Sequence, residues 1–173
     1  MKGCSQIGAL ILAAILLACA PAASQADAPL KADSVVVYKA KRKLYLYSGG
    51  KILKTCDIAL GKSPAGHKRQ EGDGRTPEGK YVLDWRNPDS KYHLSLHISY
   101  PNEADRKRAK QQGVSPGGDI MLHGYPGGAF KSWWSRYWFL GRDWTDGCIA
   151  VSNSAIEYIW KSVDDGDPIQ IHP

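Results

Sequence analysis

Short stretches in which hydrophobic and polar residues alternate predict a chain built mainly of β-strands. The clearest is residues 94–99, where Leu94, Leu96 and Ile98 alternate with polar side chains. Similar strand-like stretches are 35–38, 44–47, 51–60, 79–83, 119–123, 149–151 and 169–171. We expect the last of these at an edge of the sheet. This set of about eight strands, connected mostly as a meander, favours a mixed, β-dominated sandwich or barrel.

Two short helices complete the predicted elements. Residues 102–112 are highly charged, with Asn102 suited to cap the helix and Asp105 in its first turn. Residues 154–163 place hydrophobic side chains at helical spacing, which predicts one buried face. Ser154 and Glu157 match a capping box at the start of this second helix.

The first 26 residues differ from the rest and are expected to be a signal peptide. Residues 7–18 form an apolar run that is shorter than the roughly 20 residues a membrane span needs. Small residues up to Ala26 suit cleavage after that position. An alternative is a lipoprotein signal, since Leu16-Leu17-Ala18-Cys19 resembles a lipobox in which Cys19 would be lipidated; an uncleaved anchor is a third. We therefore expect export to the periplasm or cell envelope, with membrane contact only through the signal or a lipid anchor.

The chain after the signal has the size of one domain, and we place its boundaries at residues 33–172. Its charge is mildly basic, since the whole chain carries a formal net charge of +6. A basic exported protein favours anionic surfaces such as cell wall or lipid headgroups, although a merely solvated basic face is an equal alternative. No segment resembles a nucleic-acid-binding module, so no nucleic-acid partner is expected.

Four histidines offer little chemistry. His93 and His97 would form a metal pair on a helix, but the alternation around them predicts a strand, where they lie about 13 Å apart. We therefore expect no metal site and no cofactor. His67 lies in a polar loop and is expected to be solvent-exposed, while His172 is expected to be inert near the terminus.

His123 and Cys148 are the candidate catalytic pair. His123 ends an apolar strand and precedes a glycine-containing loop, and Cys148 follows Gly147 in a tight turn. A thiol needs a base to be a good nucleophile near neutral pH, and imidazole is the usual one. Amide groups near Gly147 and Cys148 could hold an oxyanion, Thr145 can fix the turn, and Asp146 is expected to point away from the thiol.

Two cysteines remain after the predicted signal, and this leaves another interpretation open. In an oxidising compartment, Cys148 and Cys56 could form a disulfide, or Cys56 could be a small buried residue. A disulfide would make the domain a non-catalytic cell-wall-binding module instead of an enzyme.

Several motifs in order resemble the YkuD family of L,D-transpeptidases. They are His123-Gly124, the Thr-x-Gly-Cys run at 145–148, and the Thr-Pro-x-Gly element within residues 75–81. Residues 87–96 and 99–102 are more narrowly similar to the YafK branch of that family. The resemblance covers about residues 33–172.

The resemblance implies a β-sandwich-like catalytic domain with the cysteine and histidine at one end of a cleft. By similarity, Cys148 is the nucleophile, His123 its base, and the Gly124 carbonyl orients the imidazole. Gly147 would belong to the oxyanion hole and Thr145 would be a structural member of the motif. The implied substrates are peptidoglycan stem peptides, with an outer-membrane lipoprotein as a further acceptor. A hydrolase that releases shortened stems or lipoprotein is the alternative within the same fold.

The chain also departs from the family pattern. Asp146 stands where many members have histidine, and the residues after Cys148 supply neither arginine nor asparagine. Arg142 is a candidate substitute for binding a substrate carboxylate, and Tyr125 and Trp144 are candidate substrate contacts. The aromatic-rich residues 130–144 could form a lid, a membrane-docking loop or a small satellite core. A sortase is disfavoured because no arginine follows Cys148.

Overall fold

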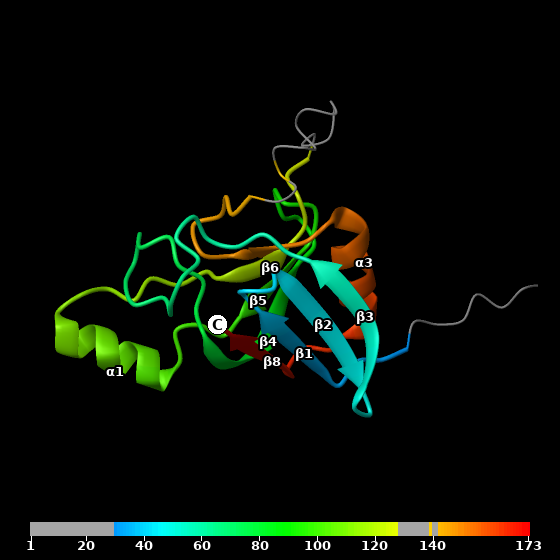
Figure 1. The fold of residues 1–173 in the computed structure, drawn as a ribbon, viewed down its shortest axis with the longest axis horizontal. Helices are drawn as coiled ribbons and strands as arrows, with labels where there is room; N and C mark the ends of the chain where they lie inside the picture. The colour runs from blue at the N-terminus through cyan, green and yellow to red at the C-terminus, as the bar shows by residue number, and fades with distance from the viewer. Residues whose placement is uncertain (1–29, 128–138, 140–141) are drawn as a thin grey trace, which may run out of the picture.

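The strands that the structure describes belong to one curled sheet. The computed structural model describes residues 30–127, 139 and 142–173. Within these residues the sheet has eight strands in the order β3-β2-β1-β8-β4-β5-β6-β7 (Figure 1). Their bounds are β1 Ser34–Tyr38, β2 Lys43–Ser48, β3 Lys51–Asp57, β4 Gly79–Asn87, β5 Ser95–Ile98, β6 Met121–His123, β7 Ile149–Ala150 and β8 Asp167–His172. The predicted strand-dominated fold class is confirmed.

The sheet closes on itself just after β3. The first three strands form antiparallel hairpins, while β8 runs parallel to β1 and antiparallel to β4. At the other end, β6 and β7 are parallel. Isolated bridges then join Ala59 to Ala150 and Gly61 to Thr145, which connects the chain following β3 to residues on both sides of Cys148. This closure brings residues from distant parts of the chain behind the candidate site.

Alternating side chains fill the interior of the curl. Leu96 and Ile98 on β5 are fully buried, whereas His97 between them faces outward. The same period-2 pattern buries Val35, Val37, Leu44, Leu46, Tyr81, Leu83, Ile169 and Ile171. Because neighbouring strands place paired residues on the same face, these side chains form one continuous hydrophobic core.

The two helices lie on opposite sides of the sheet in Figure 1. Helix α1, Glu103–Gln112, begins with a reciprocal capping box between Asn102 and Asp105, which confirms the predicted cap at Asn102. Helix α3, Asn153–Ser162, buries the apolar face that its spacing predicts, including Ile156 and Ile159. Its N-cap is Ser152, whose hydroxyl accepts from the Ala155 N–H, so the capping box predicted from Ser154 is wrong.

Three other predictions need correction. Strand β8 lies inside the sheet between β1 and β4, not at an edge, and buries Ile169 and Ile171 on the core side. Strand β3 ends at Asp57, before the predicted Leu60. His67 is not solvent-exposed, because its ring donates to the Asp105 carboxylate and accepts from the Glu78 N–H.

The predicted signal segment, residues 1–26, lies outside the described residues, as does most of the aromatic segment 130–144. In the part of the chain that the structure describes, the helices are too short and too polar to cross a bilayer.

Candidate active site

His123 is held in one tautomer at the end of β6. Its ring is almost fully buried, and Nδ1 lies 2.6 Å from the carbonyl oxygen of Gly124. A carbonyl can only accept, so Nδ1 carries the proton and Nε2 keeps its lone pair. Burial lowers the pKa of His123 below its ordinary value, and the Gly124 hydrogen bond partly opposes that shift. The imidazole is therefore neutral and basic at Nε2 near neutral pH.

Aromatic rings and a tight backbone contact fix the orientation of this imidazole. The ring of Tyr92 lies 4.4 Å from it, centroid to centroid, and the Trp144 indole lies 5.7 Å away with its edge toward it. A Cβ at Gly124 would come within 2.8 Å of the Asn153 side-chain oxygen. That same oxygen accepts from the Tyr125 N–H, so α3 holds the loop that carries the orienting carbonyl.

Cys148 lies immediately before β7, beside the start of β6. The Met121 N–H donates to its sulfur over 3.4 Å, and the thiol donates to the Asp119 carbonyl over 3.6 Å. The side chain is half-buried, and both Cys148 and Cys56 are free thiols in the structure. Burial is the main cause that raises the pKa of Cys148; the Met121 amide opposes it and the Asp146 carboxylate adds to it. The resting thiol is therefore protonated.

Cys148 and His123 project from the same face of the sheet. In the parallel β6–β7 pair, Leu122 is opposite Ile149 and His123 is opposite Ala150. Continuing the register places Cys148 opposite Met121, which agrees with the contact between the Met121 amide and the sulfur. The two Cα atoms are then about 8 Å apart, from roughly 3.3 Å per residue and 4.8 Å between strands. Both side chains can reach one reacting group from that separation.

Thr145 stabilises the turn that presents the candidate nucleophile, Cys148. Its hydroxyl donates to the Cys148 carbonyl over 2.7 Å and accepts from the Gly147 N–H over 3.2 Å. The Gly147 amide is thus already used inside the turn. By contrast, the Cys148 N–H has no acceptor within residues 30–127, 139 and 142–173. The amide of Cys148 itself is the free donor beside the sulfur.

Backbone packing requires glycine at position 147. Its φ of 139° lies in a region that other residues rarely adopt, and an added Cβ would meet the Arg75 carbonyl oxygen at 2.7 Å. Residues 74–76 therefore support the turn from behind. The Thr76 hydroxyl accepts from the Gly61 N–H, which fixes the residue that bridges to Thr145.

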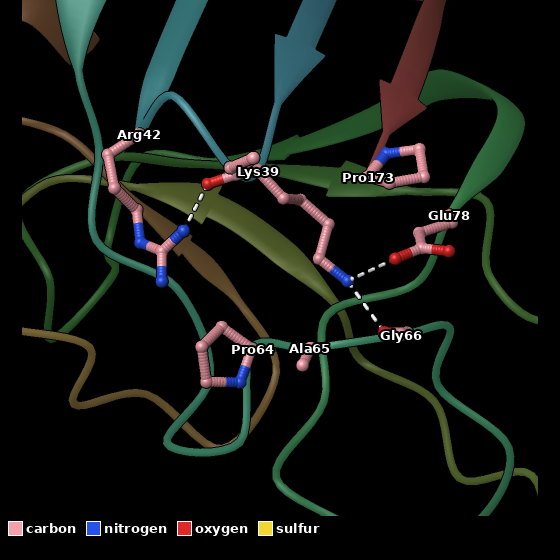
Figure 2. Close-up of a pocket in the computed structure, with 8 residues that line it drawn as sticks. Lys39, Arg42, Pro64, Ala65, Gly66, Glu78 and Pro173 are labelled. Carbon is pink, nitrogen blue, oxygen red and sulfur yellow. Dashed lines mark hydrogen bonds and ion pairs between the residues drawn. The ribbon is translucent and has the colours of Figure 1, made fainter.

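A buried lysine anchors this supporting loop to the sheet. Lys39 is 2% exposed, and its ammonium donates to the carbonyls of Gly66 and Thr76 and to the Glu78 carboxylate, at 2.6, 2.9 and 2.8 Å. Figure 2 shows the side chain reaching from the end of β1 across a cavity of about 310 Å³ to Gly66 and Glu78. Arg42 donates to the Lys39 carbonyl and pairs with Asp143 over 2.6 Å. Polar contacts thus join the loop to the β1–β2 turn.

The model of the L,D-transpeptidase catalytic domain, YkuD, matches residues 32–171. The chain belongs to the YkuD family. It is 28% identical over 178 aligned residues to YafK of Escherichia coli (strain K12), whose name assigns it to the L,D-transpeptidases; the alignment covers 90% of this chain and 63% of YafK. The chain thus spans less than two thirds of that relative.

Solved structures share this fold. The helical cell shape determining protein Pgp2 of Campylobacter jejuni is 29% identical, with a TM-score of 0.58 over 84% of this chain and 51% of that one. Bd1075 of Bdellovibrio bacteriovorus is 27% identical, with a TM-score of 0.54; the match covers 82% of this chain and 48% of Bd1075. An L,D-transpeptidase from Xylanimonas cellulosilytica shares the fold at 16% identity and a TM-score of 0.52. The match covers 83% of this chain and 61% of the Xylanimonas chain.

A small cavity opens beside the sulfur of this YkuD domain. It has a volume of about 230 Å³ and is bordered by two glycine-containing loops, at residues 71–72 and 117–119. Lys68 lies in its wall, is buried, and donates to Asp73 over 2.9 Å. Asp146 is at the rim but points to solvent, where it pairs with Lys62. A ligand in this cavity would lie beside the Cys148 sulfur.

The remaining candidate residues differ in how deeply they are buried. Trp144 is half-buried against His123, and its buried indole N–H has no acceptor among the residues that the structure describes. Tyr125 is buried, with its ring 6.2 Å from that of Trp144. Arg142 is exposed.

His93 pairs with Glu157, away from His97, and no cluster of metal-ligating side chains occurs within the described ranges.

Four residues of the site were missed from the sequence. Tyr92 covers the imidazole, Asn153 holds the Gly124 loop, Lys68 lies in the wall near the sulfur, and Lys39 anchors the supporting loop. Lys39 belongs to a lysine-rich stretch that suggests a solvated turn, and nothing local marks it as buried. Only the long-range fold reveals these roles.

Proposed function

We propose that the protein is a cysteine-dependent L,D-transpeptidase that forms an acyl-enzyme with peptidoglycan stem peptides. The observation that carries the proposal is the fixed tautomer of His123. With Nδ1–H committed to the Gly124 carbonyl, Nε2 is a base on the same face of the sheet as Cys148. The family match supports the reaction class, and the side chains provide the groups that the reaction needs.

Acylation begins from a neutral pair. The sulfur of Cys148 attacks the carbonyl carbon of the L-centre residue that precedes a terminal D-amino acid, while the thiol proton moves to Nε2 of His123. The carbonyl becomes an oxyanion that the Cys148 N–H stabilises from within the turn. The peptide C–N bond then breaks, the imidazolium returns the proton to the departing amine, and a thioester remains on Cys148.

Deacylation uses the same two groups. An amine of a second stem attacks the thioester carbon, His123 removes its proton, and the thiol is released in protonated form. The product is a cross-link, or a protein–peptidoglycan bond if a lipoprotein supplies the amine. Water in place of the amine gives a shortened stem, which makes a hydrolytic enzyme the second candidate. The two differ only in the second nucleophile.

The first experiment measures the acyl-enzyme by intact mass after mixing with purified stem peptides. We expect an adduct and released D-amino acid with the wild type and with Cys56→Ala, and neither with Cys148→Ala. His123→Gln should retain the fold and lose at least about a hundredfold in acylation rate. Adduct formation by Cys148→Ala at the wild-type rate would refute the nucleophile.

A second experiment separates the two outcomes. Muropeptides incubated with the wild type are expected to give dimers, and shortened monomers alone would assign hydrolysis instead. Export belongs to the same proposal: residues 1–26 act as the signal, and the protein recovered from the envelope should begin after Ala26, or at a lipidated Cys19. An envelope-free protein with an intact N-terminus would contradict it.

A further inference from the structure

A β-bulge places two consecutive side chains on the outer face of the sheet. In the β4–β5 pair, Leu83 is opposite Ile98 and Arg86 is opposite Leu96, so both Asp84 and Trp85 lie opposite His97. The His97 ring stacks on the Trp85 indole, with centroids 4.9 Å apart and planes 16° apart. Its Nδ1 donates to the Asp84 carboxylate over 2.6 Å. Bulges often re-aim side chains beside active sites.

The same face of the sheet carries the candidate nucleophile. His97 is paired with Met121 across β5 and β6, and the Met121 N–H contacts the Cys148 sulfur. Trp85, His97, Met121 and Cys148 therefore form a row across neighbouring strands. At roughly 4.8 Å per strand, the indole lies about 15 Å from the cysteine. We call Asp84, Trp85 and His97 the Trp85 platform.

The Trp85 platform exposes a planar apolar surface beside polar groups. Trp85 is 44% exposed, and within residues 30–127, 139 and 142–173 the aromatic ring that stacks on it is His97. An aromatic face is electron-rich and attracts the weakly positive C–H groups that line one side of a sugar ring. The Asp84 carboxylate, which pairs with the stacked His97 ring, is partly exposed and can accept from hydroxyl or amide groups.

We propose that the Trp85 platform binds a hexosamine ring of the glycan strand while the peptide attached to that strand reaches Cys148. This inference rests on the proposed function. A stem of about three extended residues spans roughly 10 Å, and its link to the sugar adds a few more. That length matches the separation between the indole and the sulfur, so one glycopeptide can occupy both places.

Calorimetric titration tests the platform without relying on activity. The probe is a trisaccharide of β-1,4-linked N-acetylglucosamine, added to the full chain. We expect weak binding that Trp85→Ala reduces at least about tenfold and that Trp85→Tyr, which keeps an aromatic face, largely restores. Ile52→Ala changes another exposed apolar residue, on β3, and should bind like the wild type. No heat with the wild type, or equal affinity in Trp85→Ala, would overturn the proposal.

A kinetic comparison separates sugar binding from peptide binding. With stems still attached to disaccharide, Trp85→Ala should raise KM about fivefold and leave kcat unchanged, whereas free stem peptides should show no change. An equal rise with both substrates would assign the platform to the peptide and overturn the sugar proposal. If the wild type turns over neither substrate, the proposed function fails, and the titration alone decides the platform. Unchanged unfolding midpoints establish that the variants are folded.

Discussion

Thr145 donates its hydroxyl proton to the backbone carbonyl of Cys148 over 2.7 Å. The same oxygen accepts from the Gly147 N–H, so one side chain satisfies both ends of the turn that carries the candidate nucleophile. The Cys148 N–H is not used in this arrangement, and in the proposed mechanism it is the donor for the oxyanion. In the proposed mechanism, catalysis by Cys148 therefore depends on a hydroxyl that does not touch the substrate.

Replacing Thr145 with valine should lower the acylation rate at least about tenfold, because the Cys148 carbonyl and the Gly147 amide both lose their partner. The free energy of unfolding should fall by about 1–3 kcal/mol. Thr145→Ser keeps the hydroxyl and should retain most of both quantities. Acylation followed by intact mass, together with urea unfolding, measures the two effects. Valine and serine variants of equal activity would contradict this role for the hydroxyl.

Gly147→Ala should destabilise the protein by at least about 3 kcal/mol, because it combines a disfavoured φ with overlap against the Arg75 carbonyl. Gly50→Ala is the matched control: its φ is also positive, at 76°, but nothing lies within 4 Å of the added Cβ. That variant should lose only about 1 kcal/mol, the cost of the backbone conformation alone. Urea unfolding compares them, and similar losses would show that Arg75 does not constrain the turn.

The pH dependence of acylation should reflect a neutral His123. Burial lowers its pKa from the ordinary 6.5, so the basic form persists below that pH and the acid limb of kcat/KM should lie below 6.5. A limb at or above 6.5 would contradict the neutral pair.

The same shift has a consequence for stability. Because the unfolded chain takes up the proton first, the contribution of His123 to folding is present above pH 6.5 and is lost as the pH falls through the lower folded value. Chemical unfolding between pH 7 and pH 5 should show this loss of unfolding free energy. The His123→Gln variant should lack the part of the pH dependence that comes from His123.

Lys39→Met should cost about 2–4 kcal/mol of unfolding free energy, since it leaves Glu78 and two carbonyls without their cationic donor. Lys43→Met is the control, because Lys43 pairs with Asp57 at the surface and such pairs contribute about 0–1 kcal/mol. Activity should fall with Lys39→Met even under conditions where the variant is fully folded. Equal stability of the two variants would show that the buried lysine does not anchor the loop.

Local patterns were sufficient for most elements and insufficient for their arrangement. The alternation around Leu96 and the helical spacing of Ile156 identify a strand and a helix because each reflects one buried face. Ile169 and Ile171 show the same alternation, yet nothing local distinguishes an interior strand from an edge strand. The position of β8 in the sheet depends on its pairing with β1, which is more than a hundred residues away in the sequence.

The residues of the candidate site could likewise be predicted only in part from the sequence. Cys148 and His123 stand out because thiol and imidazole are reactive and lie beside glycines, and the structure places both on one sheet face. Lys39 and Asn153 could not be identified, since ammonium and amide groups are common at surfaces and acquire their roles here through distant backbone partners. The Trp85 platform depends on a bulge, which shifts the register without a recognisable local sequence.

The position of β8 also makes the continuity of the whole sheet depend on one strand. Strands β1 and β4 are not paired with each other, and the gap between them is filled by residues 167–172. The curled sheet therefore has an open seam until residues 167–172 have paired with both neighbours. Because the connection between β1 and β4 runs through this segment, truncation or unfolding of β8 divides the sheet into two parts that the described residues join only through the isolated bridges at Ala59 and Gly61.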